Sequence, residues 1–135
     1  MIKRSGQKGF ILPGVEGLIM IGGLMVSVTL LSLNSARMKS RDAKRMADVR
    51  QLASALELYY YDKNSYPNSL SELTPIYIGI IPTAPKPPDG TCTLEQNEYS
   101  YKKTAADKYR LTFCLGAVTQ GYAQGNRTLT QAGVE

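Results

Sequence analysis

The stretch from Gly9 to Tyr61 restricts what this chain can fold into more than any other part of it. Its first half carries no charge from Gly17 to Ala36. In its second half, apolar residues recur every three or four positions and form one stripe along a helix; they are Met46, Val49, Leu52, Ala53, Leu56 and Tyr60. We therefore predict one long helix with an apolar first half and an amphipathic second half.

Residues 10–36 form the predicted apolar segment, and residues 10–33 alone suffice to cross a hydrocarbon core, which needs about 20 residues. The preceding leader, residues 1–9, contains Lys3, Arg4 and Lys8, and basic residues beside an apolar span stay in the cytoplasm. The sequence therefore predicts a single-pass membrane helix with the C-terminus outside. A removed secretory signal is the alternative, but helical sequence continues through SLNSAR, where its cut would fall.

Residues 37–62 continue the helix and are rich in cations. Asp42 and Arg45 stand three positions apart, and Lys44 and Asp48 four apart, which are the spacings of ion pairs on an exposed helix. We interpret this basic segment as a solvated face or as a set of ion pairs between subunits. Binding of DNA or lipid headgroups is a weaker alternative, because no aromatic residues alternate with the cations to stack on bases.

Residues 63–135 remain for a small head outside the cytoplasm. Prolines punctuate residues 75–88 and forbid both a helix and a central strand there. Residues 99–102 and 109–115 alternate between polar and apolar, which predicts an antiparallel hairpin. Tyr122–Gln124 or Thr128–Thr130 adds an edge strand, or the tail is loosely held. The expected fold class is α+β: a long N-terminal helix packed on a sheet of two to four strands.

Composition argues against an enzyme. The chain contains no histidine, and Cys92 and Cys114 lack CxxC spacing. The residues that form the usual zinc sites, Ser-His-Asp triads and Cys-His pairs are therefore missing from the sequence. Glu57 and Asp62 do not face one another on a helix and make no acid–base pair. The carboxylates of the head are too scattered to predict a calcium site; they are Asp89, Glu95, Glu98 and Asp107. We expect no catalytic residue, no metal and no cofactor.

Two patterns in the N-terminal half carry a family resemblance. Lys8-Gly9-Phe10 precedes the uncharged span, and SLNSARMKSRDAKRMADVRQLASALELYYYDKNSYP follows it. Over about residues 8–67 the chain resembles the type IV pilin and pseudopilin superfamily, whose precursors carry a prepilin-type N-terminal methylation domain. The resemblance implies that prepilin peptidase cuts between Gly9 and Phe10 and methylates Phe10.

The segment after the cleavage glycine departs from the family pattern. Family members usually carry glutamate as the fifth residue after the cut, where this chain has Gly14 in the sequence Pro13-Gly14-Val15-Glu16. In the family that glutamate pairs with the N-terminal ammonium of a neighbour during assembly. We assign this role to Glu16, which lies about 200° further round a helix and about 3 Å further along. A minor subunit that tolerates losing the acid, or a chain no longer processed well, are the alternatives.

The two cysteines of an exported head are expected to be oxidised. Thiols oxidise outside the cytoplasm, so a single Cys92–Cys114 disulfide is predicted, and pilins often staple their C-terminal part in this way. Two free buried thiols in an unexported protein are the alternative.

The resemblance implies a structural subunit of a type IV pilus-like filament, a methylated pilin of a fimbrium. Such a chain moves from the inner membrane to an extracellular filament at the cell surface. The implied partners are other copies in a helical homopolymer, other pilins, prepilin peptidase, the assembly machinery and membrane lipid, with DNA as a weak addition. The alternatives are a pseudopilin of a type II secretion or DNA-uptake apparatus, and an unprocessed single-pass membrane protein with a binding head.

Overall fold

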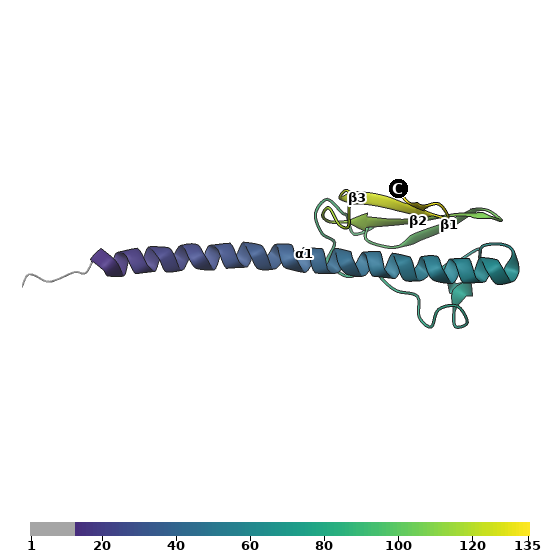
Figure 1. The fold of residues 1–135 in the computed structure, drawn as a ribbon, viewed down its shortest axis with the longest axis horizontal. Coiled ribbons are helices and arrows are strands. Elements are labelled where there is room, and N and C mark those ends of the chain that lie inside the picture. Colours follow the sequence, from purple (N-terminus) through teal and green to yellow (C-terminus); the bar gives the residue numbers. More distant parts are fainter. Residues whose placement is uncertain (1–12) are drawn as a thin grey trace, which may run out of the picture. The chain divides into compact units, whose positions relative to one another are not determined.

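The computed structural model describes the backbone of residues 13–135 and the side chains of residues 20–135 except 24 and 26–28. The chain divides into two compact units, Met1–Ser35 and Ala36–Glu135, and one helix, α1 (Pro13–Lys63), contributes residues to both (Figure 1). After α1 come a short 3-10 helix, η1 (Leu70–Leu73), and four strands: β1 (Ser100–Ala105), β2 (Lys108–Leu115), β3 (Gly125–Thr130) and β4 (Gly133–Val134). The α+β fold class and the predicted hairpin are therefore confirmed.

The described part of the first unit is helical. It exposes large apolar side chains, namely Met20, Ile21, Met25, Leu30, Leu31 and Leu33. Among the described residues, none of the helices combines enough length with enough apolarity to qualify as a membrane crossing. The predicted membrane segment begins at Phe10, which lies outside the described residues, so the segment stays a prediction.

The four strands form one antiparallel sheet in the order β1-β2-β3-β4. Leu111 of β2 pairs with Tyr101 of β1 on one side and with Leu129 of β3 on the other. Every second residue of β2 is buried, namely Tyr109, Leu111, Phe113 and Leu115, whereas Lys108 and Arg110 on the other face are exposed. Cys114 also lies on that other face but is buried. The two-residue period of the sequence therefore corresponds to one face of the sheet turned inward.

The hydrophobic core of the second unit lies between this inward face and the second half of α1. Figure 1 shows β1, β2 and β3 along one side of the blue-to-teal part of the helix. The helix contributes the stripe that the sequence predicted, with Met46, Val49, Leu52 and Leu56 almost fully buried. Apolar burial of this kind is the main stabilising term for so small a unit.

The proline-rich segment after η1 has no regular secondary structure, as its prolines predicted. Ile78 is buried, whereas Ile76 and Ile80 are exposed. The ring of Tyr77 lies 5.2 Å from that of Tyr59, and its hydroxyl donates a 2.8 Å hydrogen bond to Asp62. The buried Ile78 side chain, the Tyr59–Tyr77 ring contact and the Tyr77–Asp62 hydrogen bond therefore hold the beginning of this segment in place.

Tyrosine hydroxyls bind carboxylates at two further places near the end of α1. Tyr59 donates to Glu72 over 2.9 Å, and Tyr66 donates to Glu57 over 2.8 Å. Hydrogen bonding to Glu72 raises the pKa of Tyr59, because ionising the phenol would place two negative charges together. Each of these pairs therefore consists of a neutral donor and a charged acceptor.

Replacing Phe113 with alanine should destabilise the second unit strongly. The Phe113 side chain is fully buried in the core, so its removal leaves a cavity that costs about 3–5 kcal/mol. Thr112 is its neighbour on the opposite face of β2 and is partly exposed, so Thr112→Ala serves as the control and should cost less than about 1 kcal/mol. Thermal unfolding of both variants measures the difference, and equal losses would contradict this description of the core.

Candidate functional site

Three of the predicted site residues fall where the structure gives no side chain. Gly9 and Phe10 lie outside the described residues. Glu16 lies within α1, but the structure describes only its backbone and not its side chain. The predictions of cleavage, methylation and assembly pairing at these residues therefore stay predictions, and the described residues with notable chemistry all lie in the second unit.

The predicted partners Cys92 and Cys114 are joined in a disulfide, with their Cα atoms 5.9 Å apart. Cys114 lies on β2, while Cys92 belongs to the loop that precedes β1. The backbone N–H of Cys92 donates to the carbonyl oxygen of Asp89 over 3.1 Å. The disulfide therefore fixes the same loop that carries Asp89.

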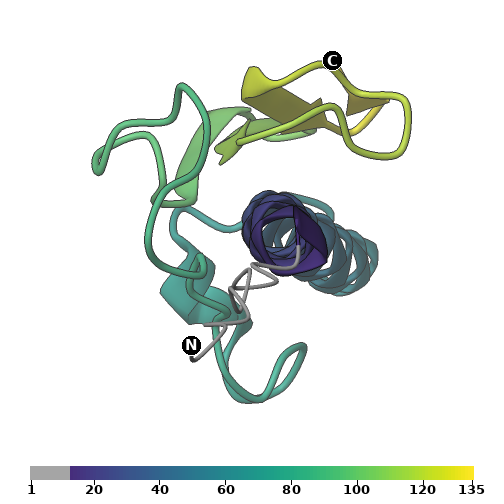
Figure 2. The same cartoon turned by 90° about the vertical axis from the view of Figure 1, so that its left-hand side faces the viewer.

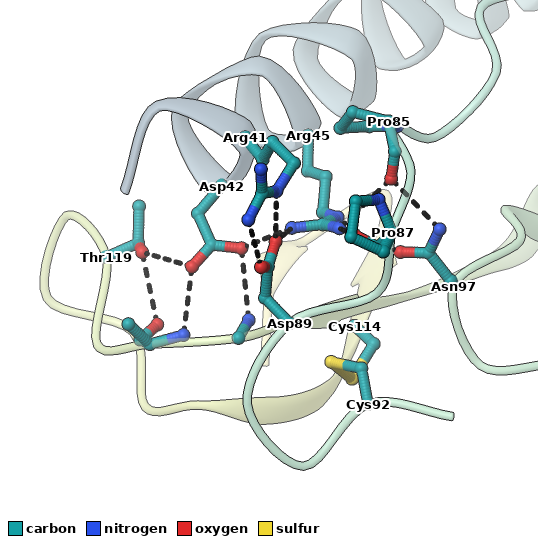
Figure 3. Close-up of polar contacts among 12 residues, drawn as sticks. Arg41, Asp42, Arg45, Pro85, Pro87, Asp89, Cys92, Asn97, Cys114 and Thr119 are labelled. Carbon is teal, nitrogen blue, oxygen red and sulfur yellow. Dashed lines mark hydrogen bonds and ion pairs between the residues drawn. A yellow bond between two sulfur atoms is a disulfide. The ribbon is translucent and has the colours of Figure 1, made fainter. Parts of the chain in front are cut away.

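A buried ionic network joins this loop to the helix, with Arg45 at its centre (Figure 3). The Arg45 side chain is 1% exposed, and its Nη1 donates to Asp42 over 2.7 Å and to Asp89 over 3.1 Å. Its Nη2 donates to the Asn97 side-chain oxygen and to the carbonyl oxygens of Pro85 and Pro87. One guanidinium from α1 thus contacts four oxygen atoms of the loop and one of its own helix.

Asp42 extends the network to the opposite loop, which follows β2. It is fully buried, and its two carboxylate oxygens accept hydrogen bonds from the backbone N–H groups of Gly116 and Ala117 over 3.0 and 2.9 Å. The hydroxyl of Thr119 donates to it over 3.3 Å. A buried carboxylate is costly unless it is paired and hydrogen-bonded, and Asp42 meets both conditions.

Asp89 receives a second guanidinium, that of Arg41. Arg41 binds it in a bidentate manner, through Nε over 2.7 Å and through Nη2 over 2.5 Å, and charge-assisted bidentate pairs are stronger than neutral hydrogen bonds. The hydrogen bond from Arg41, together with that from Arg45, lowers the pKa of Asp89 despite its burial. Two guanidinium groups and two carboxylates therefore balance each other's charge inside the second unit.

Two glycines allow the loops to approach closely enough for this network. A Cβ atom on Gly90 would lie 2.1 Å from the carbonyl oxygen of Gly116, and Gly90 has a φ of +57°. A Cβ atom on Gly116 would lie 2.3 Å from the Cβ of Asp89. Both distances are far inside van der Waals contact, so only glycine fits at either position.

The network corrects the interpretation of the basic segment as a solvated face. Asp42 and Arg45 were expected to form an exposed pair, but both are buried, and Arg41 is also turned to the loop. Lys44 pairs with Asp48 as its spacing predicted, and Asp48 also accepts from Tyr99 over 2.8 Å. Helical spacing predicts which residues pair within α1. It does not predict their burial, because the loop residues that cover them are 40 or more positions away in sequence.

The arrangement is suited to positioning and offers no reactive group. Its carboxylates are occupied by guanidinium and backbone donors, which leaves none of them available as a base. Within the described part of the chain, no three His, Cys, Asp or Glu side chains gather closely enough to hold a metal ion. The network therefore acts by fastening two loops and the disulfide region to the second half of α1.

Comparison with known proteins finds relatives that match about half of the chain. It is 31% identical over 68 residues to the type II secretion system core protein G of Klebsiella michiganensis, covering 50% of this chain and 48% of the relative. The proteins of the same name from Pectobacterium carotovorum and Aeromonas hydrophila are 33% and 31% identical over 63 and 68 residues, covering 40% and 48% of their lengths and 47% and 50% of this chain. No family model and no solved structure matches.

The chain is thus distantly homologous to core protein G over about half its length. It spans less than half the length of each of these relatives. This finding supports the resemblance to the pilin and pseudopilin superfamily in its broad form, and it agrees with the α+β fold.

Replacing Arg45 with alanine should destabilise the second unit by about 3–5 kcal/mol, because it leaves Asp42 buried with only neutral partners and deprives Asp89 of one of its two cations. Lys39→Ala is the control, since Lys39 is an exposed cation of the same helix that no salt bridge joins to an acid among the described residues; it should cost less than about 0.5 kcal/mol. Urea unfolding measures both. A loss below about 1 kcal/mol for Arg45→Ala would mean that the network contributes little to stability.

Proposed function

We propose that this chain is a pseudopilin-like subunit of a fibre in a type II secretion-type apparatus. The observation that carries the proposal is the similarity to three core protein G sequences, taken together with the Lys8-Gly9-Phe10 junction before the apolar segment. The similarity favours this reading over the first expectation, a subunit of a surface pilus. Its role is structural and not enzymatic.

In this proposal the helix serves two environments in turn. Residues 10–36 anchor the new subunit in the inner membrane, with the head outside the cytoplasm. After cleavage the subunit leaves the membrane, and its apolar residues exchange lipid contacts for contacts with neighbouring copies. The partners are other copies and pilin-like proteins, prepilin peptidase and the assembly machinery.

A repeated contact between different surfaces of identical copies gives an open helical fibre when the rotation does not close. A subunit of such a fibre needs a head that keeps its shape while the helix changes surroundings. The Arg45 network and the Cys92–Cys114 disulfide meet this need, because both act within the second unit. The disulfide also suits an oxidising compartment outside the cytoplasm.

Replacing Gly9 with leucine should block processing. The proposed peptidase cuts after Gly9, so the variant should keep residues 1–9 and its mass should exceed that of the mature wild-type chain by the mass of the leader. Mass spectrometry of the membrane-extracted protein gives the answer. Gln7→Leu is the control and should be cut normally. A wild-type chain that retains Met1 beside an active peptidase would contradict the proposal and favour an unprocessed membrane protein.

Replacing Glu16 with alanine should weaken assembly and leave membrane insertion intact. An acid inside an apolar segment is costly by about 2.5–3.5 kcal/mol and is retained where it finds a partner; here the proposed partner is the N-terminal ammonium of a neighbour. The yield of sheared fibre, divided by the total membrane-inserted subunit, measures the effect. Unchanged fibre yield would remove the pairing role from Glu16 without affecting the proposed processing.

A further inference from the structure

One edge of the sheet has no neighbouring strand. β1 is the outermost strand in the order β1-β2-β3-β4, and Figure 2 shows it in green on the side of the sheet opposite the yellow β3. Among the described residues, the backbone of residues 100–105 makes hydrogen bonds to β2 and to no other segment. An edge strand directs part of its N–H and C=O groups away from its single neighbour, so these groups of β1 remain available to a further strand.

An open groove of about 610 Å³ follows this edge. It is lined by Asn68 and residues 101–106. Successive residues of a strand point to opposite faces, so a groove that all of them line runs along the edge of β1. The hydroxyl of Tyr101 donates to the carbonyl oxygen of Pro67 over 2.7 Å, and the N–H of Tyr66 donates to the carbonyl oxygen of Ala106 over 2.9 Å. These hydrogen bonds fix the segment after α1 beside the groove.

Two cations lie directly opposite each other on the outer face of the sheet beside the groove. Lys102 of β1 pairs with Arg110 of β2, and both residues are exposed. Like charges opposite each other on neighbouring strands repel, and no salt bridge joins either to an acid among the described residues. Glu98 precedes β1 and Asp107 follows it, so the nearest acids in sequence lie beyond its ends. The middle of the edge is therefore positively charged.

We propose that the free edge of β1 binds an extended acidic segment of another protein, which adds a fifth strand to the sheet. The backbone of the segment pairs with the outward N–H and C=O groups of residues 101–105. Its side chains alternate between two faces, so acidic side chains lie next to Lys102 on the outer face and apolar ones lie next to Tyr101 on the inner face. This contact goes beyond the proposed fibre function and does not depend on it.

Charge complementarity identifies the occupant of the groove. The edge of β1 from a second copy brings its own Lys102 and Lys103 toward the lysines of the first copy, and lysines on edge strands oppose pairing of this kind. An acidic segment instead places a carboxylate beside Lys102 and offsets its repulsion with Arg110. The edge therefore selects against a second copy and in favour of an acidic strand.

Peptides of about six residues, the usual length of a strand, test the proposal on the full chain in detergent micelles. The probe alternates glutamate and valine and carries a fluorescent label, so that anisotropy measures its binding. A peptide with lysine in place of each glutamate should bind at least tenfold more weakly, because its charges repel the cations of the edge. A third peptide keeps the glutamates but is methylated on every backbone nitrogen; it should also lose at least tenfold, since it has no N–H to donate.

Exchanging the charge of the edge provides a matched pair of variants. Lys102→Glu should weaken binding of the glutamate peptide about fivefold and strengthen binding of the lysine peptide, because the attraction is transferred from one to the other. Lys39→Glu makes the same change at an exposed lysine of α1 that does not line the groove. This control should leave the binding of both peptides unchanged.

A second pair of variants tests the backbone of the edge. Thr104 has no partner on β2, and proline is tolerated at bulges and edges of a sheet. Thr104→Pro removes one N–H from the edge and should weaken binding of the glutamate peptide about tenfold, whereas Thr104→Ala keeps that N–H and should bind as the wild type does. Thermal unfolding checks that the proline variant is folded, and the methylated peptide gives the answer on the wild type where it is not.

Hydrogen exchange shows where the peptide binds. The bound glutamate peptide should slow exchange of N–H groups within residues 101–105 and leave those of β3 unchanged. Slowing confined to other residues overturns the proposal, as does the lack of saturable binding below about 1 mM. Equal binding of the methylated peptide would show attraction between charges alone. Slowing of the same groups at high protein concentration without peptide would show a second copy as the occupant, and either result overturns the addition of an acidic strand. No measurement here requires a fibre, so failure of the proposed function leaves the result unaffected.

Discussion

The arrangement of the head depends on the burial of one guanidinium. Arg45 leaves water almost completely, and an ion can do so only where opposite charge and hydrogen-bond acceptors replace its hydration. Asp42 comes from its own helix, but Asp89, Asn97 and the carbonyl oxygen of Pro85 come from the loop before β1. The loop must therefore adopt the one conformation that brings these oxygen atoms to Arg45.

The disulfide and the ionic network act on one short stretch of chain from opposite sides. Asp89 ties that stretch to α1, and Cys92, three residues later, ties it to β2. Cross-linking restricts the unfolded chain, whereas the network stabilises the folded one. The hydrophobic core needs both kinds of support, because a head of this size buries limited apolar area.

The sequence predicted the regular elements more accurately than the polar site. The helical stripe through Leu52 and the alternation through Phe113 each follow from local periodicity, so the helix, the hairpin and the core could be predicted. The disulfide was predicted from the expected location of the head outside the cytoplasm and from the presence of two cysteines in the chain. The network did not, because Arg45 has the same local spacing whether exposed or buried. Its environment is set by Asp89 and the irregular segment around it, and no periodic pattern predicts how such a segment folds back.

The three phenol–carboxylate hydrogen bonds at the end of α1 have a consequence for the medium in which the head exists. Dissolved salt weakens the attraction between two full charges far more than that between a charge and a neutral dipole. High salt therefore weakens hydrogen bonds such as that from Tyr77 to Asp62 only slightly. The end of α1 should therefore keep these contacts over a wide range of salt concentrations.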